Sequence, residues 1–189
     1  GFAQDYTDET FTITFTPGET GPLTRGIALT IDNVAEVTET LTVVCTEQSG
    51  GVASVLKGNG TATVTDDDTA IINVLDTSSF ENTTDNNLVE VTMSIPASRQ
   101  VDLTCSLIPG TAVPGTNPGE DYTDATFAIT FNPGDSGTIT RDVVLTDDDT
   151  AEGVESFNVS CVETTPAVAV IADPVGIATI SPDDLSIVT

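Results

Sequence analysis

Neighbouring carboxylates are the residues of this sequence with the clearest capacity for chemistry. Residues 66–68 and 147–149 are runs of three aspartates, residues 183–184 are an aspartate pair, and each run follows a strand-like segment. Carboxylates this close repel one another, and a hard cation such as Ca²⁺, which takes about six to eight oxygen ligands, relieves the repulsion. The clusters therefore indicate a divalent-cation site; the alternative is that these acids only solvate turns.

The overall charge excludes several classes of partner and reaction. The chain has 4 basic and 30 acidic residues, a net charge of −26, so binding to nucleic acid or anionic lipid would be repulsive. It contains no His, which rules out Ser-His-Asp and Cys-His arrangements and His-ligated zinc. A carboxylate pair of the glycosidase kind is not excluded by counting. Because the acids already have a cation explanation, we expect a protein that is not an enzyme.

An internal repeat sets the domain organisation. The stretch from Ala3 to Cys45 is a degraded copy of the stretch ending at Cys161, and Asp5 matches Asp121 at an offset of 116 (121 − 5) without gaps. A gapless period of this size indicates tandem domains rather than a short solenoid repeat. We expect a partial unit at 1–68, a complete unit at 69–184 and the start of a further unit at 185–189. The partial unit lacks its opening strands, which predicts a longer parent array or strands supplied by a neighbouring chain.

Hydrophobic periodicity predicts an all-β chain. Phe and Ile alternate with other residues at 11–15 and again at 127–131, each time before a Pro-Gly turn, and long helical patterns are absent. We expect strands at 70–75, 88–95, 101–107, 126–131, 138–145, 154–162 and 176–181. The fourth and fifth are expected to form a hairpin pair, and residues 76–87 a polar connection. Short strands at this spacing predict tandem immunoglobulin-like antiparallel β-sandwiches.

Cysteines and glycosylation sequons indicate an oxidising, extracellular setting. Cys45 and Cys161 occupy matching repeat positions, while Cys105 has no counterpart in the first unit. We expect a Cys105–Cys161 disulfide and an unpaired Cys45; three buried free thiols are the alternative. Sequons begin at Asn59, Asn82 and Asn158, the last facing outward from its strand. No apolar run is long enough to span a bilayer, so we expect no direct membrane insertion.

Four motifs, in the same order in both units, resemble the Calx-β domain family, first described in sodium–calcium exchangers. In the complete unit they are an Asp-Tyr-Thr turn at 121–123, an Ile-x-Phe-x-Pro-Gly segment at 129–134, an Asp-Asp-Asp-x-x-Glu-x-x-Glu junction at 147–155 and a closing Ala-Thr-Ile-x-x-Asp-Asp at 178–184. Together the two sets cover nearly the whole chain. The resemblance implies a β-sandwich with acids from several loops meeting at one end.

The resemblance also implies which acids bind calcium. In the complete unit the implied ligands are Glu81, Asp121, Asp147, Asp148, Glu152, Glu155, Asp183 and Asp184. In the first unit they are Asp5, Asp32, Glu36, Asp66, Asp67 and Asp68, with Glu39 beside them. Pro182 stands where the family has a further acid, and Ile31 and Asn33 replace acids in the first unit, so that first site is expected to be the weaker.

The functional expectation is an extracellular structural or adhesive repeat module of a longer rod or filament stiffened by Ca²⁺. Its expected partners are neighbouring repeats of the same array, in homotypic or head-to-tail assembly, with glycans as further partners or decorations. The alternative is a calcium-sensing regulatory module like those of sodium–calcium exchangers.

Overall fold

A computed structural model describes residues 4–82, 88–165 and 168–184, which divide into two units. The first unit comprises Gly1–Asn33 and Val37–Asp66, and the second comprises Val34–Glu36 and Asp67–Thr189. The described residues form strands, turns and irregular segments. No helix among them is long and apolar enough to cross a bilayer.

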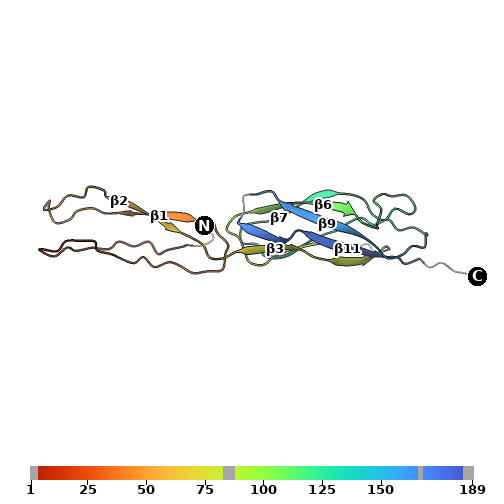
Figure 1. Cartoon of the computed structure of the whole chain (residues 1–189), viewed down its shortest axis with the longest axis horizontal. Helices are drawn as coiled ribbons and strands as arrows, with labels where there is room; N and C mark the ends of the chain where they lie inside the picture. Colours follow the sequence, from red (N-terminus) through yellow and green to blue (C-terminus); the bar gives the residue numbers. More distant parts are fainter. Residues whose placement is uncertain (1–3, 83–87, 166–167, 185–189) are drawn as a thin grey trace, which may run out of the picture. The chain divides into compact units, whose positions relative to one another are not determined.

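The second unit is built from two sheets of paired strands (Figure 1). One sheet has the order β10-β3-β5-β8, with bounds Ala169–Asp173, Ala70–Val74, Val89–Met93 and Gly137–Arg141. The other has the order β4-β11-β9-β6-β7, with bounds Thr77–Phe80, Val175–Ser181, Glu155–Glu163, Val101–Pro109 and Thr126–Phe131. Most pairs are antiparallel, whereas β10 runs parallel to β3 and β11 runs parallel to β4. The predicted all-β sandwich is confirmed.

Alternating side chains of the two sheets form one hydrophobic core. On β6 every second residue from Val101 to Leu107 is buried, and on β9 Phe157 and Val159 are buried in the same way. This period of two arises because successive side chains of a strand point to opposite faces of its sheet. Phe157 also stacks on the buried Tyr122, with ring centroids 4.3 Å apart.

Three expectations about the strands are wrong. The predicted polar connection after Leu75 contains strand β4, whose Ser/Thr-rich sequence lacks an apolar stripe because main-chain bonds to β11 hold this edge strand. Strand β10 was not predicted at all. The strands at 126–131 and 138–145 do not pair as a hairpin: β7 pairs with β6 in one sheet, and β8 pairs with β5 in the other. The Pro-Gly turn between them therefore carries the chain across the sandwich.

The disulfide links two neighbouring strands of the core. Cys105 on β6 and Cys161 on β9 are direct cross-strand partners with a Cα–Cα distance of 4.0 Å, and their sulfur atoms are bonded. Both residues are buried. Cys45, the repeat equivalent of Cys161, is an exposed free cysteine.

The first unit has little regular structure of its own. Strands β1, Glu39–Val44, and β2, Asn59–Val64, pair antiparallel, and most of the remaining chain carries no strand arrow (Figure 1). Leu41 is its buried hydrophobic residue, at 6% exposure, while Phe15 is 58% and Ile31 90% exposed. This unit therefore has strand-like sequence without a developed core.

Candidate metal centre

Three acidic side chains, Asp121, Glu152 and Glu155, meet where several strands of the second unit end, and the charge of Glu81 acts on the same group. Glu81 directly follows β4, and its N–H donates to the carbonyl of Ser181 at the end of the parallel strand β11 (3.0 Å). Glu155 begins β9 and lies opposite Ile180 of β11, so it belongs to the same end of the sheet. Glu152 precedes it by three residues, and Asp121 arrives from the loop between β6 and β7.

Asp121 is held rigidly in place by the main chain around it. Its N–H donates to the carbonyl of Val113 at 2.7 Å, and the N–H of Val113 donates back to its Oδ2 at 2.5 Å. The carbonyl of Asp121 accepts from the N–H of Thr146 at 2.9 Å. One carboxylate oxygen is thus occupied, and the residue is only 3% exposed. Ligand atoms of Asp121, Glu152 and Glu155 all lie within 4.8 Å of one another.

The carboxyl group of Glu81 has a strongly raised pKa. The residue is 4% exposed, and burial raises the pKa of its carboxyl to about 7. The charges of Glu152, Asp148, Asp183 and Asp121 raise that pKa further. Desolvation and like charges both disfavour the ionised form, so this carboxylate is destabilised unless a positive charge joins it.

The two glutamates near β9 are perturbed in the same direction. Burial raises the pKa of Glu155 to about 7, with hydrogen bonding and charge repulsion from Asp121 adding to the effect. Burial and the charge of Asp121 also raise the pKa of Glu152. In the described part of the chain, no basic side chain lies within ion-pairing distance of Glu81, Asp121 or these two glutamates.

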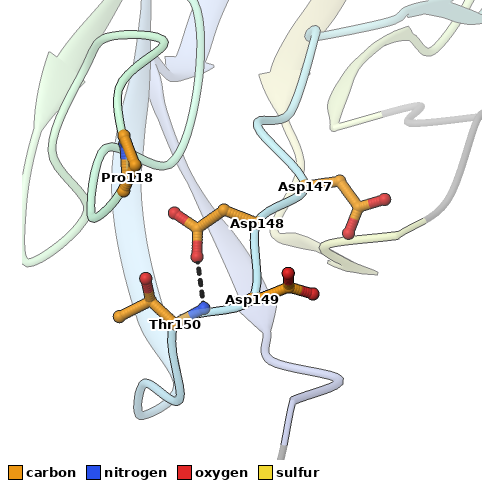
Figure 2. Close-up of a pocket in the computed structure, with 5 residues that line it drawn as sticks. All are labelled: Pro118, Asp147, Asp148, Asp149 and Thr150. Carbon is orange, nitrogen blue, oxygen red and sulfur yellow. Dashed lines mark hydrogen bonds between the residues drawn. The ribbon is translucent and has the colours of Figure 1, made fainter.

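The aspartates at 147–149 border this group. Figure 2 shows their carboxylates pointing in different directions around a pocket that Pro118 and Thr150 also line. Asp148 is the most constrained, because its oxygens accept the N–H groups of Gly119 (2.8 Å) and Thr150 (2.6 Å). These bonds lower its pKa and keep it ionised. Gly119 has φ +78°, a conformation that favours glycine, so its identity helps to aim this N–H.

The closing aspartates approach the same group from the end of β11. Asp183 Oδ2 accepts the amide Nδ2 of Asn82 at 2.6 Å, which ties it to the residue after Glu81. Partial desolvation and the charges of Asp183, Asp149 and Asp147 raise the pKa of Asp184. All eight acids predicted for the complete unit are thus tied to one neighbourhood by contact or by charge. Within it, the structure assembles Asp121, Glu152 and Glu155 most tightly.

Of the six acids predicted for the first unit, three consecutive ones lie close together. Only one other group of three acids in the described residues brings its ligand atoms within 4.8 Å, and it consists of the consecutive residues Asp66, Asp67 and Asp68. Asp5, Asp32 and Glu36 belong to neither group. The main-chain carbonyl of Asp5 accepts the N–H of Thr30 at 2.7 Å.

Two contributors to the site were missed at the level of sequence. Asn82 was interpreted only as the start of a sequon, yet its amide positions Asp183. Its place directly after Glu81 was the available signal. Gly119 was not among the predicted site residues, and its N–H group donates to Asp148. A main-chain donor leaves no mark in the sequence beyond the glycine itself.

The donor set fits a hard divalent cation. Every candidate ligand is a carboxylate oxygen, and oxygen-only sites suit Ca²⁺ rather than softer metals, which prefer thiolate or imidazole. A bound cation would offset the repulsion that raises the pKa values of Glu81 and Glu155. The residues present are therefore those that would hold Ca²⁺ at this end of the second unit.

Comparison with known proteins agrees with this fold. The Calx-beta domain family matches residues 3–70 and 66–184. No curated protein sequence matches the chain. Among solved structures, the chain is similar to the apo form of the Calx CBD1 domain, with 20% identity over 62% of this chain and 100% of that one, at a TM-score of 0.51.

Two larger solved structures give the same result. The chain is 19% identical to the calcium binding domain CBD12 of CALX1.1, with a TM-score of 0.51, and 21% identical to CBD12 from CALX1.2, with a TM-score of 0.52. Each match covers 60% of this chain and 46% of the other, so the chain spans about half of these structures. At these identities the likeness shows a shared fold. Because the family matches nearly the whole length in two copies, the chain belongs to the Calx-beta domain family.

Proposed function

We propose that the second unit is a calcium-binding module, with Glu81, Asp121, Glu152 and Glu155 as the main ligands. The observation that carries the proposal is a group of desolvated carboxylates, two with pKa values near 7, that no basic side chain neutralises. The likeness of the chain to the calcium binding domain CBD12 of CALX1.1 supports the choice of cation. Asp148 and Asp183 lie beside the four and supply further charge.

The role best supported is calcium-responsive, like the regulatory modules of sodium–calcium exchangers. In the metal-free protein, like charges oppose the meeting of Asp121, Glu152 and Glu155. Bound calcium would neutralise the repulsion between these carboxylates. It would thereby stabilise the end of the sandwich where β4 and β11 end and β9 begins. Occupancy would then control how firmly the loops at this end are held. This support is stronger than that for an adhesive role, on which neither the site nor the related structures bear.

A calcium titration of the full chain tests the proposal. A ligand that binds only the folded state at a hundredfold excess over its Kd stabilises that state by about 2.7 kcal/mol. We expect calcium to raise the midpoint of thermal unfolding of the second unit by roughly 10 °C relative to chelator. Titration calorimetry with calcium chloride alone should give a saturable binding signal in the same sample.

The internal repeat provides a matched control. Asp121→Asn should abolish most of the calcium shift, because it removes a ligand while an amide oxygen can still accept the N–H of Val113. Asp5→Asn changes the equivalent residue of the first unit and should leave the shift in place. Equal calcium responses in both variants, or none in the unmodified chain, would refute the site.

A second candidate function is an extracellular structural repeat. The buried Cys105–Cys161 disulfide and the tandem family matches favour it, since disulfides persist in oxidising environments. A calcium-stiffened rod predicts that small-angle scattering of the full chain changes between calcium and chelator. Identical scattering curves combined with a clear thermal shift would confine the calcium effect to the second unit.

A further inference from the structure

The centre of the outer face of the five-stranded sheet is occupied by Asn158. The strand register pairs Asn158 of β9 with Ile108 of β6 on one side and with Ile177 of β11 on the other. Directly paired residues of neighbouring strands project from the same face of a sheet. Because Phe157 and Val159 are buried, Asn158 and its two isoleucine partners form a row on the outer face.

This face is almost uncharged, although the chain as a whole is strongly acidic, and it carries several exposed aliphatic side chains. Ile108 is 45% and Ile177 47% exposed, and the adjoining outward residues Val175 and Val162 are 40% and 58% exposed. The remaining outward positions on β6, β9 and β11 are serine or threonine, apart from Asp102 at the far end of β6. The two exposed isoleucines beside Asn158 therefore offer aliphatic side chains that a group attached to Asn158 can cover.

Asn158 itself indicates the occupant. It begins the sequon Asn158-Val159-Ser160, and its carboxamide makes no hydrogen bond to any described residue. The amide of Asn82, by contrast, is engaged with Asp183 beside the acidic group. We propose that Asn158 carries an N-linked glycan whose first sugars cover the Ile108–Ile177 row. This rests on the proposed extracellular setting and is independent of calcium binding.

The modification requires a lipid-diphosphate-linked oligosaccharide as donor. The Nδ2 atom of Asn158 loses one proton and bonds to C1 of the first N-acetylhexosamine. The bond from that C1 to the diphosphate breaks, and the lipid diphosphate leaves with the bonding electrons. No oxidation or reduction is involved.

The dimensions of the row suit a sugar. Neighbouring strands lie about 4.8 Å apart, so one isoleucine flanks Asn158 at that spacing on each side. A pyranose ring attached to the asparagine can rest its C–H groups on these side chains while its hydroxyls face water. The surrounding Ser106 and Ser160 would lie beneath the edge of the sugar.

The test uses the full chain secreted through a eukaryotic secretory pathway. We expect mass spectrometry to find a glycan on Asn158, lost in Ser160→Ala and retained in Ser160→Thr, because both variants keep Asn158 and only the second keeps the sequon. Enzymatic removal of the glycan should increase the fluorescence of an apolar dye. That increase should disappear when Ile108→Ser and Ile177→Ser are introduced together.

Three results would overturn the inference. The first is an unmodified Asn158 in a secreted chain that carries a glycan on Asn59. The glycan on Asn59 would show that the chain had been exposed to the oligosaccharide donor. The second is a glycan on Asn158 whose removal leaves dye binding unchanged. The third is an unmodified chain that dimerises until Ile108→Ser makes it monomeric, which would assign the row to a second copy. Calcium titration of the same samples reports on the proposed function separately.

Discussion

The two units carry nearly the same motifs but bury them very differently. Ile129 and Phe131 of the second unit are 0% and 1% exposed, whereas their repeat equivalents Ile13 and Phe15 are 40% and 58% exposed. In the second unit these residues lie on β7, which pairs with β6. In the described part of the first unit, residues 10–15 form no strand and no strand pairs with them. An alternating pattern therefore becomes a buried strand only where its pairing partner is present.

Local pairings, by contrast, are the same in both units. β1 and β2 pair with Glu39 opposite Val64, which is the register of Glu155 opposite Ile180 in β9 and β11. The bridge between Tyr6 and Leu29 likewise reproduces the bridge between its equivalents, Tyr122 and Leu145. These contacts form because both partners are encoded within the same stretch of sequence. The comparison separates pairings that both units share from the core packing found in the second unit.

The largest expected effect comes from truncating one equivalent phenylalanine in each unit. Phe131→Ala should destabilise the second unit by about 3–5 kcal/mol, because it leaves a cavity in a closed core. Phe15→Ala removes an exposed side chain and should change stability by no more than about 0.5 kcal/mol. Urea unfolding of both variants measures the difference. A comparable loss in Phe15→Ala would show that the first unit is more closely packed than described.

The cysteines give the next largest contrast. Replacing Cys105 and Cys161 together by alanine should cost about 2–4 kcal/mol, since the disulfide closes a loop with a sequence separation of 56 residues. Cys45→Ala should leave the free energy of unfolding unchanged, because Cys45 is exposed and forms no disulfide. Denaturant unfolding under non-reducing conditions provides the measurement. Loss of stability on reduction of the double variant would point to a different covalent link.

Removing one glutamate charge should have two effects of opposite sign. Glu155→Gln should stabilise the metal-free second unit at pH 8, because it removes a charge that burial and Asp121 disfavour. The same change should reduce the stabilisation by calcium by about 1–2 kcal/mol, because one ligand is lost. This is less than the total of about 2.7 kcal/mol that calcium binding can supply. Glu39→Gln is the matched control in the first unit and should do neither. Thermal unfolding with calcium and with chelator distinguishes these outcomes.

The smallest expected effect is the pH dependence of the metal-free protein. Glu81 and Glu155 have folded-state pKa values of about 7, above the ordinary 4.5, so the folded protein binds protons more tightly than the unfolded chain. Stability should therefore rise as pH falls from about 7 to about 4.5. Asp148, whose pKa is lowered, acts only at lower pH. Unfolding in chelator at pH 5 and pH 8 checks the sign, and equal stability would contradict the raised pKa values.

The same protons link pH to calcium affinity. Because calcium binds the ionised carboxylates, binding should release protons and weaken between pH 8 and pH 6. Calorimetry in two buffers of different ionisation enthalpy measures that release. The double variant of Glu81→Gln and Glu155→Gln should show almost none.

Sequence alone determined the class of fold, the repeat and the identity of the acids. Alternating apolar residues predict strands because successive side chains of a strand point to opposite faces. Tandem units are recognised from similarity between two parts of the same sequence. The pairing of Cys105 with Cys161 also followed from repeat positions, and the structure contains it. Strands β4 and β10 escaped prediction because pairing by main-chain hydrogen bonds requires no particular side chain.

Only the tertiary structure decided which acids meet. Glu81, Asp121 and Glu155 are far apart in sequence, and they converge because β4 runs parallel to β11 while β9 runs antiparallel to it. Burial then turns a surface run of acids into carboxylates with raised pKa values, which composition cannot reveal. Among the described acids predicted for the first unit, those that come this close are the consecutive residues Asp66, Asp67 and Asp68, rather than acids from separate strands. Desolvation, rather than the number of acids, therefore separates the candidate site from its repeat copy.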